Sequence, residues 1–166
     1  MAKRQDEFVR IAMPHTRSLL RVARRLSSNP ATAEDLVQET MFLAWRGFHQ
    51  FQPGTNIRAW LFRILLNAFN AEGRKLRSTP ATVPLQSREF YADTHLQTAA
   101  EIAQVLDELG LEQRTALLLV VVEGFTCREA AGILSVPIGT VMSRLGRARE
   151  ELRKRLAPKC SAKEAS

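Results

Sequence analysis

The sequence predicts an all-α fold made of two small helical domains joined by a flexible linker. Apolar residues recur with helical spacing over residues 8–76 and again over 99–156, and no stretch alternates apolar and polar residues for long enough to form a strand. The segment between them is rich in Pro, Ser and Thr and nearly neutral, which is typical of a linker. We therefore expect a domain at 1–77, a linker at 78–98, a second domain at 99–157 and a polar tail at 158–166.

The first domain should contain three helical stretches. Apolar positions over residues 8–26 share one stripe, and Pro14 marks a kink or a new start within it. After an Asn-Pro break, Thr32 is a candidate N-cap for the next helix. A Gln-Pro-Gly-Thr turn at 52–55 leads into a third helix from about residue 56 to 75. This helix is apolar on several sides, so we expect it at the centre of the bundle.

The second domain should contain four helices. Residues 98–101 form a capping box that opens the first helix, and Gly110 suits its C-terminus. A second helix runs from about Leu111 to Glu123 and closes at Gly124. Another capping box at 126–129 opens a short helix, and a strongly basic helix then ends near residue 156.

The segment 126–155 has the layout of a helix-turn-helix, whose second helix enters the major groove of DNA. Small alanines at 130 and 131 let the two helices approach closely, and Pro137 suits the first turn of the second helix. An apolar stripe from Val141 to Leu152 should face inward. Arginines on the other side can fork onto guanine edges or clamp phosphates. The alternative is a solvated helix of some other bundle.

Composition excludes several classes of protein. The 166 residues include 24 Lys and Arg against 17 Asp and Glu, and a net charge of +7 favours a polyanionic partner, nucleic acid first. Cys127 and Cys160 are too few for a disulfide framework and form no CxxC pair for zinc. The longest apolar run, Ala116–Val122, is too short to cross a bilayer, and no secretory signal precedes it. We expect a cytoplasmic protein without membrane insertion, metal or cofactor.

The first domain adds a second basic region, in which arginines alternate with aromatic residues along the third helix. This mixture suits stacking on unpaired bases and neutralisation of the DNA backbone. The structural alternative is that the aromatics form the core; we expect this for most of them, including Trp60. The connection at 49–56 is a better candidate for contact, because a loop between packed helices is exposed.

These motifs resemble the extracytoplasmic-function (ECF) sigma factors. Residues 33–39 (AEDLVQE), 44–46 (AWR), 56–64 (NIRAWLFRI) and Asn67 resemble their region 2, and residues 123–126 (EGFT), 129–131 (EAA) and 136–149 (VPIGTVMSRLGRAR) resemble their region 4. The likeness covers nearly the whole chain in the family's order. The loop at 51–56 looks most like the EcfG type, which serves the general stress response.

The resemblance implies a transcription initiation subunit that binds core RNA polymerase, directs it to promoters and helps to open the duplex. Region 2 would capture the melted non-template strand, with Phe51 and Asn67 at positions that contact a flipped-out base; its candidates are Phe51, Asn56, Arg58, Trp60, Arg63 and Asn67. Region 4 would read the distal element as duplex through Thr140, Ser143, Arg144, Arg147 and, on phosphate, Arg149. Polymerase would dock on Asp35, Leu36, Gln38, Glu39, Phe42 and Arg46.

The resemblance also implies control by an anti-sigma factor, which in the EcfG branch is a small helical protein of the NepR type, removed by a phosphorylated PhyR-type regulator. Two other functions stay open. A PhyR-like decoy would bind the anti-sigma factor instead of DNA, although the sequence holds no receiver domain. A stand-alone helix-turn-helix repressor would leave the motif at 33–39 without a purpose. An enzyme is not expected, because His15, His49 and His95 lie apart and no glycine-rich phosphate loop occurs.

Overall fold

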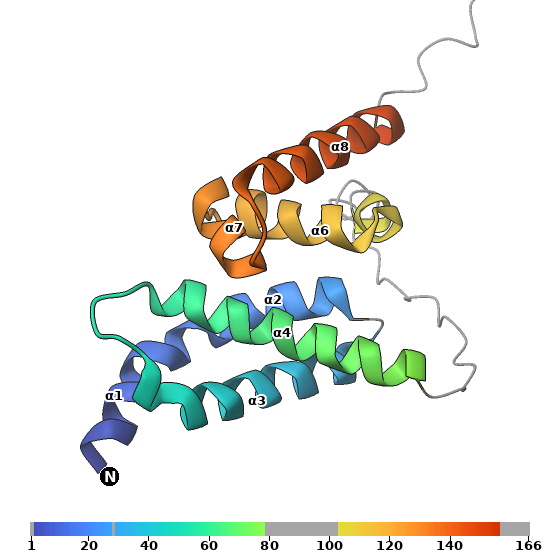
Figure 1. Ribbon diagram of the computed structural model, residues 1–166. Helices are drawn as coiled ribbons and strands as arrows, with labels where there is room; N and C mark the ends of the chain where they lie inside the picture. Colours follow the sequence, from blue (N-terminus) through green and yellow to red (C-terminus); the bar gives the residue numbers. More distant parts are fainter. Residues whose placement is uncertain (1, 28, 79–102, 157–166) are drawn as a thin grey trace, which may run out of the picture.

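The computed structural model describes residues 2–27, 29–78 and 103–156, and in these ranges all regular structure is helical. The all-α prediction is therefore confirmed for the described residues. Two helical layers lie one on the other: the N-terminal part, residues 2–78, and the C-terminal part, residues 103–156 (Figure 1). The capping box expected at 98–101, nearly all of the linker expected at 78–98 and the tail expected at 158–166 lie outside the described residues.

The N-terminal part consists of α1 (Ala2–Ala12), α2 (Thr16–Leu26), α3 (Pro30–Gly47) and α4 (Ile57–Ser78), with short 3-10 turns at Met13–His15 and Phe48–Gln50. Pro14 lies in the first of these turns, so the predicted kink is confirmed. The cap of α3 differs from the prediction: Asn29, not Thr32, is the N-cap, and its Oδ1 accepts from the Thr32 amide at 2.8 Å. Pro30 can then occupy the first helical position, where its missing N–H costs nothing.

The central helix of this part is α4, as predicted. It packs against α1, α2 and α3 on one side and against α7 of the C-terminal part on the other. Leu61, Phe62 and Leu65 of α4 are fully buried. Because α4 lies between two groups of helices, it is apolar around most of its circumference rather than along one stripe.

The C-terminal part contains helical residues 103–108, α6 (Leu111–Leu117), the π-helical segment η3 (Leu118–Val122), α7 (Cys127–Leu134) and α8 (Ile138–Leu156). Gly124 has a φ of +72° after η3, the left-handed conformation that a glycine adopts without strain, and the predicted stop is confirmed. Gly110 is the N-cap of α6 rather than the end of the preceding helix, which stops two residues earlier.

The predicted helix-turn-helix of α7 and α8 is present. Thr126 Oγ1 accepts from the Glu129 amide at 3.2 Å, and Glu129 Oε2 accepts from the Thr126 amide at 2.8 Å, which completes the capping box of α7. Val141 and the other apolar residues of its stripe in α8 face inward as expected. Pro137 lies one residue before α8, and its carbonyl accepts from the Thr140 amide at 3.0 Å.

Candidate nucleic-acid interface

The outer face of α8 is open to solvent. Ser143, Arg147 and Arg149 are exposed there, opposite the buried stripe. Arg144 differs from its neighbours, since its side chain is only 17 % exposed and its Nη2 lies 2.9 Å from Glu112 Oε1 of α6. In this arrangement Arg144 joins α8 to α6, whereas the guanidinium groups of Arg147 and Arg149 can reach a groove or a phosphate.

The loop before α4 has an aromatic base. Phe51 stacks on Phe48 with ring centroids 5.8 Å apart, and its other neighbour, Trp60 of α4, lies at 5.3 Å. Both Phe51 and Trp60 are half-buried and pack on the core. Asn56 Oδ1 accepts from the Ala59 amide at 3.1 Å and so caps the start of α4. Asn67, further along α4, is exposed.

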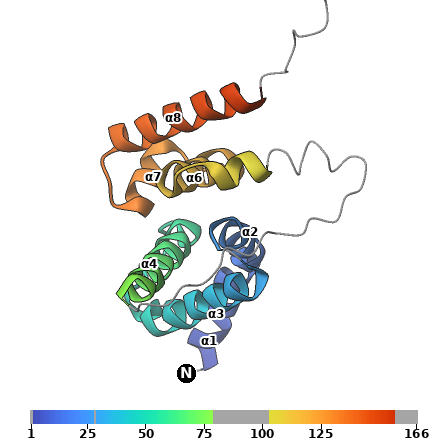
Figure 2. The same ribbon diagram turned by 90° about the vertical axis from the view of Figure 1, so that its right-hand side faces the viewer.

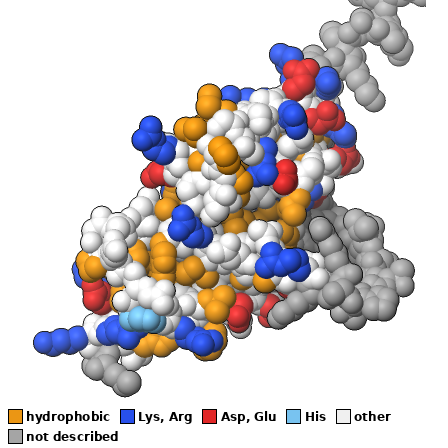
Figure 3. Space-filling view, viewed as in Figure 1, with side chains coloured by type: hydrophobic (Ala, Val, Ile, Leu, Met, Phe, Trp, Pro, Cys, Tyr) orange, Lys and Arg blue, Asp and Glu red, His pale blue; other side chains and the backbone are white. Residues whose placement is uncertain are grey.

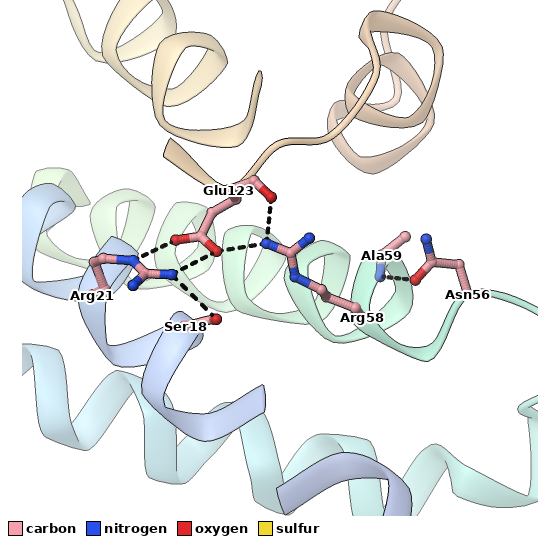
Figure 4. A network of polar contacts seen from close by, with 6 residues as sticks. All are labelled: Ser18, Arg21, Asn56, Arg58, Ala59 and Glu123. Carbon is pink, nitrogen blue, oxygen red and sulfur yellow. Dashed lines mark hydrogen bonds and ion pairs between the residues drawn. The ribbon is translucent and has the colours of Figure 1, made fainter. Parts of the chain in front are cut away.

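A buried carboxylate joins the two parts of the molecule. Glu123, directly after η3, has a side chain with no exposed surface. Its Oε1 lies 2.8 Å from Arg21 Nε, and its Oε2 lies 3.1 Å from Arg21 Nη2 and 2.6 Å from Arg58 Nη2 (Figure 4). Burial alone would raise the pKa of Glu123, but the hydrogen bonds and charges of both arginines outweigh it and hold the pKa below its ordinary value.

Further contacts surround this carboxylate. Arg58 also donates to the Glu123 carbonyl at 2.5 Å and stacks over the Phe125 ring at 4.3 Å. Phe62 of α4 meets Phe125 edge to face at 5.3 Å, and Phe62 is therefore core rather than a base-stacking residue. Arg63 Nη2 donates to the Gly132 carbonyl at 2.6 Å.

Asn56 completes the contact, because its Nδ2 donates to Glu129 Oε1 of α7 at 3.1 Å. The structure therefore brings Asn56, Arg58 and Arg63 into hydrogen bonds with the C-terminal part, although Asn56 and Arg63 stay exposed at its edge. Asn67 is exposed as well. Arg21 and Glu123 were not among the predicted site residues. The available signal was weak: an acid at the end of an apolar run, and arginines on a helix without any acid.

The predicted polymerase-docking residues lie on α3. Asp35, Gln38, Glu39, Phe42 and Arg46 are exposed, and the Phe42 side chain, 54 % exposed, lies 5.6 Å under the Arg46 guanidinium. Leu36, the other residue expected to dock, is buried in the core rather than exposed. Helix α3 lies on the far side of the N-terminal part from α6 and α8 (Figure 2).

One face of the molecule carries Lys and Arg side chains over both parts, with apolar side chains between them (Figure 3). Within the described ranges, no helix is long and apolar enough to span a membrane. The same ranges hold no group of three His, Cys, Asp or Glu side chains placed to bind a metal.

Family comparisons follow this division of the chain. Residues 11–79 match the model of Sigma-70 region 2, and residues 99–152 match that of Sigma-70, region 4. Together the two matches define a transcription initiation factor of the sigma-70 class.

Individual relatives narrow the class. The chain is 40 % identical over 139 residues to the ECF RNA polymerase sigma factor EcfG of Rhodopseudomonas palustris, covering 81 % of this chain and 77 % of the relative. The sigma factor RpoE of Bartonella quintana, solved with the anti-sigma factor NepR, is 32 % identical with a TM-score of 0.80 over 92 % of this chain and 98 % of that one. CnrH, solved with the cytosolic domain of CnrY, is 28 % identical with a TM-score of 0.71 over 93 % and 90 %. The chain belongs to the ECF sigma factors, the RNA polymerase subunits that direct the enzyme to promoters.

Proposed function

We propose that this ECF sigma factor divides promoter recognition between a domain at 1–77 and a domain at 99–157. The major groove of intact duplex admits a helix, so α8 can read the distal element through Ser143 and Arg147, with Arg149 on phosphate. Bases near the start site are hidden in the stack, so the first domain captures them only after extrusion, with Phe51 and Asn67 as its candidates. The observation that carries this proposal is the exposed, arginine-rich outer face of α8 opposite its buried stripe.

Polymerase docking is assigned to the exposed face of α3. Phe42 is the proposed anchor, because a large apolar side chain beside an arginine is the usual composition of a binding hot spot. Asp35, Gln38, Glu39 and Arg46 form its polar rim, and Leu36 contributes only by packing the helix.

Control by an anti-sigma factor of the NepR type is supported by the likeness to a sigma factor solved with NepR. The protein would act in the cytoplasm, where polymerase and DNA are found, as a binding subunit and not as an enzyme. This assignment predicts that the purified chain binds a NepR-type protein. It also predicts that the NepR-type protein and core polymerase compete for binding to the chain.

Core-polymerase binding tests the function directly. The wild-type chain should bind core enzyme, and Phe42→Ala should weaken binding by about tenfold or more. Val9→Ala is the matched control, since Val9 is also an exposed apolar residue of the N-terminal part but lies on α1. If the chain does not bind core enzyme, the proposed function is refuted. The two remaining functions are then the PhyR-like decoy and the stand-alone repressor.

Footprinting separates those outcomes. We expect the free chain to protect promoter DNA negligibly and the holoenzyme to protect both elements, because polymerase fixes the spacing of two weak binders and raises their effective concentration. Equal protection by the free chain would point instead to a stand-alone repressor.

A further inference from the structure

Arg21 of α2 and Arg58 of α4 form a two-arginine pocket on the N-terminal part, which we name the arginine fork. Arg21 reaches both oxygens of the Glu123 carboxylate through Nε and Nη2, and Arg58 reaches Oε2 as well (Figure 4). Ser18 Oγ lies 3.3 Å from Arg21 Nη2 and helps to fix its orientation. Planar guanidinium groups that grip two oxygens of one carboxylate have the geometry that also grips two oxygens of a phosphate.

The electrostatics of the fork favour an anion from outside the N-terminal part. Helix α2 holds no acidic residue, and the first turn of α4 holds none either. Arg58 is the second residue of α4, so the fork lies at the positive end of that helix dipole. Burial and the charge of Arg58 lower the pKa of the neighbouring His15, in keeping with a positive local field. The anion that fills the fork therefore comes from the C-terminal part.

We propose that the arginine fork is a DNA phosphate site and that Glu123 occupies it as a stand-in anion, so that the C-terminal part blocks part of the strand-binding face until DNA displaces it. This inference rests on the proposed function and adds Arg21, which no motif includes, to the DNA-contacting residues. Arg58 of the fork lies two residues after Asn56, the last residue of the loop expected to contact the melted strand. A strand lying on that loop would bring its backbone phosphates toward α4 and the fork.

Neighbouring contacts hold other candidates of the strand-binding face in place, although their side chains stay exposed. Arg63 and Asn56 are held by α7, so withdrawal of Glu123 releases them together with Arg58. The docking face of α3 lies on the opposite side and stays open in the closed form (Figure 2). Polymerase can therefore dock first, and the strand then competes with Glu123 for the fork.

Binding of a fluorescein-labelled single strand of 20 thymidines to the full chain tests the proposal without polymerase. Glu123→Gln removes the competing charge, and we expect about fivefold to tenfold tighter binding in low salt from one or two added phosphate contacts. The slope of log affinity against log salt should steepen by about 0.7 for each added phosphate. Glu34→Gln is the control for net charge, because Glu34 is an exposed acid of α3 that pairs only loosely with Arg24, at 3.5 Å.

Second-site variants identify the fork itself. In the Glu123→Gln background, Arg21→Gln should abolish the gain, whereas Arg24→Gln should keep it. The two arginines lie on the same helix with side chains 51 % and 53 % exposed, and Arg24 does not reach Glu123. Glu123→Asp keeps the charge but shortens the side chain, which weakens its hydrogen bonds to the fork. It should therefore give a smaller gain in affinity for the strand, and Arg21→Gln should again remove that gain. This variant tests the proposal even if Glu123→Gln folds poorly.

Two results would overturn the proposal. In one, Glu123→Gln and Glu123→Asp bind the strand no better than Glu34→Gln; in the other, Arg24→Gln removes the gain as completely as Arg21→Gln. Failure of the chain to bind core polymerase would refute the proposed function instead and leave the strand-binding results to judge the fork.

Discussion

Helices α4 and α8 are both rich in arginine and both carry residues predicted to contact DNA, yet the structure uses them differently. The arginines at 58 and 63 of α4 hydrogen-bond to the C-terminal part, whereas those at 147 and 149 of α8 are exposed and point away from the N-terminal part's contacts. Helix α8 packs on α6 and α7 of its own part, while α4 packs on helices of both parts. Positive charge on a helix therefore marks an accessible DNA face only where the charged side of the helix is free of contacts with the other part of the molecule.

The difference has a functional consequence. A helix exposed along one side can enter a major groove as it stands. On α4, Arg58 becomes available only when Glu123 withdraws. The predictions below test this contrast between a covered helix and an open one.

The largest effect is expected at Phe62 of α4, which is fully buried and packs edge to face on Phe125. Phe62→Ala should lower the free energy of unfolding by about 3–5 kcal/mol, because it leaves a cavity in the core. Met142→Ala on α8, where the side chain is 59 % exposed, should change it by about 0.5 kcal/mol or less. Urea denaturation followed by circular dichroism measures both. Equal losses would mean that α4 is no more buried than α8.

The next largest effect separates the two helices by the promoter element each one serves. Arg147→Ala should weaken recognition of the distal element, and Asn67→Ala chiefly that of the proximal element, each by about 1–3 kcal/mol. Both side chains are exposed, so neither change should unfold the chain. Transcription in vitro from promoters mutated at one element at a time measures the two defects. Indistinguishable defects would contradict the assignment of one helix to each element.

Features set by neighbouring residues were predictable from the sequence. The capping box of α7, the stop at Gly124 and the inward stripe of α8 depend on residues within a few positions of one another, and all three are confirmed. The cap of α3 was misassigned because Asn29 and Thr32 both carry capping side chains and only the backbone decides between them.

Contacts between distant segments could not be predicted in this way. Arg21 and Glu123 are 102 positions apart, and no local pattern pairs them. The burial of Leu36 was also hidden, because a docking motif leaves open which of its residues face the core. The sequence could therefore assign the open helix α8 more fully than the covered helix α4.

A smaller change in stability tests whether the contact between α4 and α7 depends on the N-cap of α7. Thr126→Ala removes the hydroxyl that caps α7 and orients Glu129, which in turn accepts from Asn56. We expect a loss of about 1 kcal/mol in the free energy of unfolding. Thr55→Ala is the control, because its hydroxyl donates only within the exposed loop, to the Gln52 carbonyl.

Two probes follow that loss in different parts of the molecule. Both tryptophans lie in the N-terminal part, so their fluorescence reports its unfolding, while circular dichroism reports every helix. If the two parts are coupled, Thr126→Ala lowers the midpoints of both signals. A change in circular dichroism alone would show that α4 keeps its fold without α7.

Acid should give the smallest effect, because it acts through the pKa of one carboxyl. The two arginines hold the pKa of Glu123 below the ordinary 4.5, so its contribution to the contact is complete above that value and is lost as the pH falls through the lowered pKa. Small-angle X-ray scattering between pH 7 and pH 3 should show the two parts separating. The pKa of Glu129 is lowered as well, because the Thr126 amide and hydroxyl donate to its carboxylate. Protonation of Glu129 therefore contributes to the same dependence of the scattering on pH. Glu123→Gln removes only the Glu123 share, so identical profiles for the two proteins would exclude Glu123 as the group that holds α4 against the C-terminal part.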